Sequence, residues 1–286
     1  MTPKDFDYLV QLLKRQSGFA LSQSQMYLLE SRLSAILRQN NLTSLEELIT
    51  SLKSNDVDLR NSVIEAVSIN NTRFFRNRRV FEKIHSIILD FLDNRTPDKH
   101  LKIMSIGCAG GQEPVSIAIL LEEMELPKDV KVSIYAADMS RQTISRAKQA
   151  MYSHYEVQKG LPIQILLKYF DKQEDDWRLK DDILKNIHYQ VYNVLQPMRE
   201  TDFDLILCRN MLSFMTPDAH QKALENIAGG LKENGSLVIG ALEMLNDNPW
   251  FEKIPDSVNR YRLKSQEQIR QWTPVRQPLF KSAMDS

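Results

Sequence analysis

The feature that most constrains this chain is a β-prone run followed by a turn of small residues and then an apolar helix. Ile103–Ile106 favours a strand, and the five residues of Gly107–Gly111 that follow it are all small. Pro114 then opens an apolar segment, Val115–Met124, and proline suits the first turn of a helix because it has no backbone N–H to pair. A strand, a glycine turn and a helix in this order begin the nucleotide site of doubly wound α/β domains.

The spacing of the glycines limits the classes of ligand that this turn can bind. Gly107, Gly110 and Gly111 do not match the G-x-G-x-x-G pattern of dinucleotide sites, and no Lys-Ser or Lys-Thr follows as a phosphate-binding loop requires. Glu113 stands just after the turn, where its carboxylate favours hydroxyls or positive charge over a polyphosphate. S-adenosylmethionine, which carries an ammonium and a sulfonium but no phosphate, is such a ligand. A tight turn with a purely structural role is the alternative.

Bulk composition excludes several classes of function. The 37 basic and 37 acidic residues give zero net charge, so no global field draws the chain to nucleic acid or to an anionic membrane. No run reaches the ~18 apolar residues of a membrane span, and the N-terminus has no apolar signal core, so we expect a cytoplasmic protein. Cys108 and Cys208 are expected to be reduced core residues, and the scattered histidines predict no metal site.

The first 70 residues predict helices alone. Apolar residues recur at helical spacing in four segments, within Phe6–Leu13, Leu28–Leu37, Leu45–Leu52 and Val63–Ile69. We therefore expect an N-terminal helical domain over 1–70, and a linker and helix over 71–98. Arg32 and Arg38 on the second helix have two interpretations: a solvated face, or a basic face that docks an acidic, helical protein.

Residues 68–81 combine a polar turn, the aromatic pair Phe74-Phe75 and three arginines within four residues. Asn70, Thr72 and Arg76 could each offer hydrogen bonds to a ligand. A helix cap followed by a solvated basic turn is the alternative.

The second predicted strand, Val130–Ala136, ends at Asp138. An ionised carboxylate at the tip of this strand can accept hydrogen bonds from both ribose hydroxyls. As an isolated residue, Asp138 would instead cap the helix expected over Gln142–Ala150. The glycine turn one strand earlier makes ribose binding the favoured interpretation.

Two further strand ends carry polar residues. Ile187–Val194 alternates and ends at Asn193-Val194, where an adenine edge could be met, and the buried run Phe203–Cys208 is followed by Arg209-Asn210. Ligands of open α/β sheets bind just beyond the carboxyl ends of the strands. Helix capping is the alternative for Arg209 and Asn210.

The remaining segments complete a doubly wound, Rossmann-like α/β sheet over 99–265. Residues 151–186 do not continue the alternation of strands and helices. We therefore predict an inserted subdomain there, with its own short helix or hairpin. The later elements that we expect are a helix over Pro217–Leu231 stopped by Asn234-Gly235, a strand over Ser236–Gly240, and two final strands, one antiparallel, near Phe251–Ile254 and Tyr261–Leu263. Residues 266–286 read as a flexible tail.

Four motifs in order, behind a helical N-terminal domain, resemble the CheR family. These are S-adenosylmethionine-dependent methyltransferases that esterify glutamates on bacterial chemoreceptors. The likeness covers roughly 1–265, and its motifs are Asn70-Asn-Thr-Arg-Phe-Phe-Arg76, Gly111-Gln-Glu-Pro114, Ala137-Asp138 and Cys208-Arg-Asn210.

The resemblance implies S-adenosyl-L-methionine as cofactor, S-adenosyl-L-homocysteine as product, and the cytoplasmic helices of a methyl-accepting receptor as partner. Arg32 and Arg38 match basic positions that face those helices, and the insertion falls where some members grip a receptor's C-terminal peptide. We expect a monomer. The expected cofactor-binding residues are those that match the family, together with one glycine of the glycine turn. They are Asn70, Thr72, Arg76, Gly107, Glu113, Asp138, Asn193, Val194, Arg209 and Asn210.

The sequence departs from the family pattern at three places. Phe214 stands where a tyrosine is usual, and Gly240-Ala-Leu-Glu243 replaces Gly-His-Ser-Glu. Ala35 and Ile36 stand where charged residues are common, so the basic helix carries fewer charges. Two alternatives therefore stay open: a cofactor-binding regulatory module with weak or no turnover, and a methyltransferase acting on a small molecule or RNA.

The expected chemistry needs no general base, because a glutamate with a pKa near ~4.3 is already ionised at neutral pH. We assign Arg76 to the methionine end of the cofactor, where its planar guanidinium would orient the incoming carboxylate. Phe214 is expected to lie against the sulfonium as a cation–π partner.

Overall fold

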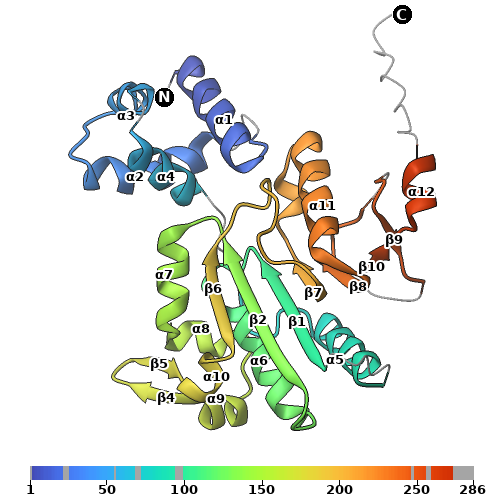
Figure 1. The fold of residues 1–286 in the computed structure, drawn as a ribbon. Helices are drawn as coiled ribbons and strands as arrows, with labels where there is room; N and C mark the ends of the chain where they lie inside the picture. The colour runs from blue at the N-terminus through green and yellow to red at the C-terminus, as the bar shows by residue number, and fades with distance from the viewer. Residues whose placement is uncertain are drawn as a thin grey trace, which may run out of the picture.

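A helical unit lies over one end of a seven-stranded sheet (Figure 1). The computed structural model describes residues 2–21, 26–54, 56–67, 72–93, 99–245, 248–255 and 259–272. No helix within these ranges is both long and apolar enough to cross a membrane. The predicted combination of an N-terminal all-α domain with a Rossmann-like sheet is confirmed.

The N-terminal unit has its own apolar core, to which Leu9, Leu33 and Leu48 contribute fully buried side chains. Thr2 caps the first helix in a reciprocal pair with Asp5, and such pairing satisfies backbone N–H groups that lack a helical partner. The helices of this unit are α1 (Pro3–Ser17), α2 (Met26–Gln39), α3 (Leu45–Lys53) and α4 (Val57–Val67).

The sheet has the strand order β6-β2-β1-β7-β8-β10-β9. All neighbours from β6 to β8 are parallel, whereas β10 runs antiparallel to both β8 and β9, so one of the last two strands is reversed as predicted. The strands are β1 (His100–Ile106), β2 (Lys131–Asp138), β6 (Ile187–Val191), β7 (Phe203–Cys208), β8 (Leu231–Ile239), β9 (Phe251–Lys253) and β10 (Arg260–Leu263).

Successive residues of the central strands alternate between two apolar cores, because strand side chains point to opposite faces in turn. On β1, Ile103 enters one core and Met104 the other, and Leu205 and Ile206 divide in the same way on β7. The first core is completed by α5 (Arg78–Asp93), α6 (Gln112–Glu123) and residues of α7 (Arg141–Gln149), and the second by α11 (Pro217–Gly230).

The structure corrects three local predictions. Helix α6 begins at Gln112, with left-handed Gly111 as its N-cap, so Pro114 is its third residue and not its first. Asn234-Gly235 lies inside β8, where a register shift against β7 absorbs the turn, and so it does not end α11. Part of the expected tail forms α12 (Gln266–Gln271), capped by Ser265, while 273–286 lie outside the described residues.

The insertion forms a second, three-stranded antiparallel sheet in the order β3-β5-β4, and it contains both of the features expected for it, a short helix and a hairpin. Its elements are β3 (Met151–Ser153), α8 (His154–Gln158), α9 (Ile163–Tyr169), β4 (Phe170–Gln173), β5 (Asp176–Leu179) and α10 (Asp181–Leu184).

The two domains are joined by backbone hydrogen bonds just after α1. Gly18 ends this helix in the left-handed region, with φ of 74°. The Ala20 N–H donates to the Phe214 carbonyl at 2.7 Å, and the Thr216 N–H donates to the Gly18 carbonyl at 2.8 Å. Between them, Phe19 and Met215 form an antiparallel bridge. The first domain is therefore fixed to the segment that follows β7.

Replacing Gly18 by alanine should destabilise the protein. A Cβ at this position would lie 2.5 Å from the Cβ of Ala219 on α11, and the left-handed backbone adds strain. We expect Gly18→Ala to lower the free energy of unfolding by about 1–3 kcal/mol in urea titrations.

The matched control is Gly229→Ala on α11, where an added Cβ meets nothing within 4 Å. Alanine is the better helix former, so this variant should be neutral or more stable by about 0.5–1 kcal/mol. Equal stability of the two variants would contradict the account of the junction.

Candidate active site

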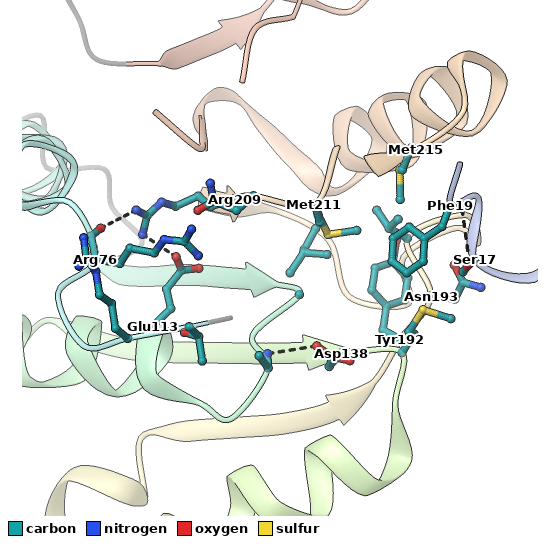
Figure 2. A pocket seen from close by; sticks show the side chains of 18 of the residues that line it. Ser17, Phe19, Arg76, Glu113, Asp138, Tyr192, Asn193, Arg209, Met211 and Met215 are labelled. Atoms are coloured by element: carbon teal, nitrogen blue, oxygen red, sulfur yellow. Dashed lines mark hydrogen bonds and ion pairs between the residues drawn. The ribbon is translucent and has the colours of Figure 1, made fainter. Parts of the chain in front are cut away.

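A cavity lies at the carboxyl ends of the parallel strands, beneath the junction between the domains. Its empty space, including the part open to solvent, is about 920 Å³. Figure 2 shows a charged end around Arg76, Glu113 and Arg209, and an apolar end around Phe19 and Met215. Nine of the ten predicted cofactor-binding residues line it: Thr72, Arg76, Gly107, Glu113, Asp138, Asn193, Val194, Arg209 and Asn210. The tenth, Asn70, lies outside the described residues.

The glycine turn brings bare backbone to the cavity. Gly107, Ala109 and Gly111 all have positive φ, at 72°, 47° and 88°. A Cβ on Gly107 would lie 3.0 Å from the sulfur of Met211, so a side chain there would crowd the lining. The turn is tied to the second strand, because the N–H groups of Gly107 and Cys108 both donate to the Ala137 carbonyl.

Asp138 occupies the end of β2 and is 8% exposed. Its carboxylate accepts hydrogen bonds from the Ala109 N–H at 3.0 Å and from the Ser140 N–H at 3.1 Å. The cap of α7 is Ser140, so the capping role considered for Asp138 belongs to another residue. Burial raises the pKa of Asp138, which the two backbone hydrogen bonds oppose. The carboxylate keeps lone pairs that can accept the hydroxyls of a ribose.

Glu113 and Arg209 form a buried ion pair at the charged end. The Arg209 Nη1 atom lies 2.7 Å from the Glu113 Oε2 atom, and their side chains are 3% and 13% exposed. Ser105 Oγ on β1 donates to the other Glu113 oxygen at 2.8 Å, and Arg209 Nη2 donates to the Arg76 carbonyl at 2.5 Å. The pair thus links β1, β7, α6 and the loop that carries Arg76.

One donor of this pair has no protein partner in the described part of the chain. Arg209 Nε is buried and makes no hydrogen bond there, although Arg209 lines the cavity. A buried donor without a partner costs about 1–3 kcal/mol, so this atom suits a ligand acceptor or an ordered water.

Arg76 is half-buried at the cavity wall. Burial and the neighbouring charges of Arg209 and Arg73 lower its pKa, but a guanidinium remains protonated at neutral pH. The cavity wall therefore carries a positive charge at this position.

Glu243 is a residue that the sequence reasoning missed as part of the site. It is 5% exposed, and its carboxylate accepts hydrogen bonds from the backbone N–H groups of Asn210 and Gly240, each at 2.7 Å, and of Ser213 at 3.2 Å. It therefore fixes the loops after β7 and β8 together. The sequence offered one signal for Glu243, namely an acidic residue shortly after a buried strand.

The apolar end of the cavity includes a wall that no sequence pattern predicted. Ser17 and Phe19 come from the helical domain, and Tyr192, Met211 and Met215 come from the loops after β6 and β7. The signal for this contact was weak: a glycine after a helix marks its end, but does not show what the following residue touches.

Phe214 does not line the cavity. Phe214 is the last residue of a short 3-10 helix, η2 (Leu212–Phe214), and the next residue, Met215, which pairs with Phe19, is the one that lines the cavity. Phe214 is instead 37% exposed. The structure therefore gives no support to the predicted contact between its ring and a sulfonium.

Three other predicted residues, Asn193, Arg32 and Arg38, differ in their place relative to the cavity. The Asn193 side chain donates to the Gln16 carbonyl at 2.7 Å and accepts from the Leu195 N–H at 3.0 Å, so it serves the domain junction as well as lining the cavity. Arg32 and Arg38 lie on α2 and are not among the lining residues.

Neither metal ligands nor a reactive thiol marks this site. Within the described ranges, no group of three or more His, Cys, Asp or Glu side chains is placed to hold a metal ion. Cys108 and Cys208 are free and buried, and burial raises the pKa of both thiols, so neither is an activated nucleophile.

The donors and acceptors of the cavity fit S-adenosylmethionine. The buried carboxylate of Asp138 and the backbone of the glycine turn line the cavity, and Arg76 and Arg209 stand at its charged end. No lysine follows the glycine turn to hold a polyphosphate. The fold and the site define an S-adenosylmethionine-dependent methyltransferase of the Rossmann-like class.

Residues 70–259 match the family described as CheR methyltransferase, SAM binding domain, and residues 4–68 match CheR methyltransferase, all-alpha domain. The chain belongs to the CheR family of chemotaxis protein methyltransferases.

Full-length relatives support the assignment. The chain is 31% identical over 251 residues to chemotaxis protein methyltransferase 1 of Pseudomonas aeruginosa, a match that covers 86% of this chain and 92% of the relative. It is 30% identical over 253 residues to chemotaxis protein methyltransferase Cher2 of Pseudomonas putida, with the same two coverages. A chemotaxis protein methyltransferase of Borreliella burgdorferi is 28% identical, over 89% of this chain and 93% of the relative.

Cofactor affinity should depend on the ionisation of Asp138. Because its pKa is raised, the carboxylate takes up a proton at a higher pH than an ordinary aspartate, and it then loses an acceptor for ribose hydroxyls. We expect calorimetric affinity for S-adenosylhomocysteine to fall as the pH is lowered from ~8 toward that pKa, which lies above the ordinary ~3.9.

Asp138→Asn should weaken binding by about 10- to 100-fold at neutral pH, the value of a hydrogen bond to a charged group. The affinity that remains in the Asp138→Asn variant should change little over the same pH range. Asp175→Asn, on an exposed turn of the insertion, is the control and should bind as the parent does. An unchanged affinity in Asp138→Asn would remove the ribose assignment.

Proposed function

We propose that this enzyme forms methyl esters on glutamate side chains of the cytoplasmic helices of chemoreceptors. Membership of the CheR family supports the reaction class, and one structural observation carries the residue assignment. Arg76 stands at the wall of the cofactor cavity, with its backbone carbonyl bound by the Glu113–Arg209 pair. A fixed cation beside the methionine end of the cofactor is what an incoming carboxylate requires.

When bound, S-adenosylmethionine supplies an electrophilic methyl group: a carboxylate oxygen bonds to the methyl carbon while the carbon–sulfur bond breaks and its electron pair stays on sulfur. No proton is transferred, so the site needs no general base. Its task is to align two reactants, and alignment can lower a barrier by about 7–11 kcal/mol in ideal cases. Arg76 orients the attacking carboxylate.

The remaining cavity residues would hold the cofactor. Asp138 would accept the ribose hydroxyls, and the backbone of the glycine turn from Gly107 would approach the sugar and the methionine closely. Asn193 and Val194 would border the adenine. The charged end, formed by Thr72 and Asn210 with the Glu113–Arg209 pair, would meet the ammonium and carboxylate of the methionine.

Receptor docking is assigned to the basic positions of α2. Arg38 is exposed and Arg32 half-buried on this helix, outside the cavity lining. Receptor methylation segments presented as acidic helices would complement such a face. In this proposal the protein acts as a monomer in the cytoplasm.

Transfer of label from S-adenosylmethionine carrying a tritiated methyl group to receptor-containing membranes tests the reaction. Base-labile label on the receptor band is expected, because a glutamyl methyl ester hydrolyses in alkali. Cofactor that binds without transfer would instead indicate a regulatory module, and label on small molecules or RNA would indicate a different substrate.

Arg76→Ala should abolish this transfer, with a loss of at least about 100-fold in kcat for a displaced carboxylate. Arg79→Ala is the control, because Arg79 is an exposed arginine three residues further along the chain and does not line the cavity. Near-normal turnover by Arg76→Ala would refute the role given to this residue.

The double variant Arg32→Ala/Arg38→Ala should raise the KM for receptor membranes and leave the KM for S-adenosylmethionine unchanged. The increase should shrink at high salt, because exposed charges are screened beyond about 10 Å at 0.1 M. A parallel change in both KM values would mean that these arginines support the fold and do not dock a substrate.

A further inference from the structure

The loop that carries Arg76 is anchored in the inserted subdomain. Phe74, two residues before Arg76, is fully buried. Its ring meets Tyr152 of β3 edge-on, with centroids 4.9 Å apart and planes at 74°. It meets Phe170 of β4 in the same manner, at 5.7 Å and 85°. Two strands of the insertion thus hold one ring of the arginine loop.

The backbones of the two segments also touch. Gly160, in the insertion, has a φ of 104°, and a Cβ there would lie 2.1 Å from the Phe74 carbonyl oxygen. Only a glycine permits this approach. The subdomain therefore fixes the main chain of the loop as well as the Phe74 ring.

Tyr152 extends the same contact to the glycine turn. Its hydroxyl would be 3.1 Å from a Cβ on Gly111, and the Tyr189 hydroxyl would be 2.8 Å from the same point. Burial raises the pKa of Tyr152, so its hydroxyl stays neutral. One side chain of the insertion thus packs against both the arginine loop and the N-cap of α6.

The loop needs such support because its backbone is strained. Phe75 and Asn77, on either side of Arg76, have positive φ values of 45° and 69°. Conformations of this kind persist only where the surroundings enforce them. The Phe75 N–H donates to Ser116 Oγ at 3.0 Å, and the Arg76 carbonyl accepts from Arg209. These bonds hold the polar side of the loop, and the insertion holds its apolar side.

We propose that the inserted subdomain sets the position of Arg76, with Phe170 and Tyr152 as positioning residues that act through Phe74. The inference rests on the proposed role of Arg76 in orienting the carboxylate. Phe170 itself does not line the cofactor cavity. Its effect on turnover must therefore pass through the loop.

A double-mutant cycle between Phe170→Leu and Arg76→Lys tests this coupling. Phe170→Leu should lower kcat by about tenfold, because small displacements of an aligning group are costly, while affinity for S-adenosylhomocysteine stays within about twofold. In the Arg76→Lys background, where alignment is already impaired, the same change should lower kcat by less than about twofold.

A matched control separates positioning from a general loss of stability. Ile227→Ala truncates a fully buried residue of α11 in the other core and should lower Tm without the selective fall in kcat. All rates are measured well below Tm. Phe170→Met, which keeps an apolar side chain without the ring, replaces Phe170→Leu in the cycle if the latter does not fold.

The outcomes distinguish the two proposals. If Arg76→Lys lowers kcat and the two changes are not additive, the positioning role is supported. If Arg76→Lys lowers kcat but Phe170→Leu has the same effect in both backgrounds, or none in either, the positioning role is overturned and the function of Arg76 stands. A normal kcat for Arg76→Lys would overturn both.

Discussion

The ion pair between Glu113 and Arg209 holds the charged end of the site together. It joins the start of α6 to the end of β7, and Ser105 and the Arg76 carbonyl complete its hydrogen bonds. The guanidinium also lies 5.8 Å from the centre of the Phe81 ring on α5. Removal of one partner from a buried pair costs about 3–5 kcal/mol, because the other charge is left uncompensated. Loss of either residue would therefore release several elements at once.

The other buried carboxylates of the site also bind the protein itself. Asp138 accepts the Ala109 and Ser140 N–H groups, and Glu243 accepts backbone donors from the loops after β7 and β8. None of them is placed as a general base, and methyl transfer to an ionised carboxylate requires none. The acidic residues instead make rigid the loops between which the reactants must be aligned.

Most of the site could be predicted from sequence because it lies at the ends of strands. A glycine turn, an acidic residue after the second strand and Arg209-Asn210 after a buried strand are local signals, and a parallel sheet brings them to one edge. The same local reasoning misplaced the start of α6 at Pro114. It also took Asn234-Gly235 as a helix end, because a register shift within a strand leaves no periodic signal in the sequence.

What sequence could not supply depends on contacts between distant segments. Phe19 reaches the cavity because the helical domain pairs with the segment after β7, and Met215, its partner in the bridge, lines the cavity beside it. The Phe74 contacts are equally remote, since β3 and β4 lie far along the chain. No spacing rule relates residues so widely separated.

The bridge between Phe19 and Met215 has a consequence for the modular view of this family. The two family domains meet at residues 68–70, yet the wall of the cavity includes Ser17 and Phe19 from near the start of the chain. A fragment that began at that boundary would keep the whole sheet but would lose one side of the cavity. Chimaeras that exchange helical domains between relatives would have to carry over the close fit of Gly18 against α11. The complete cavity is formed only by the two domains together.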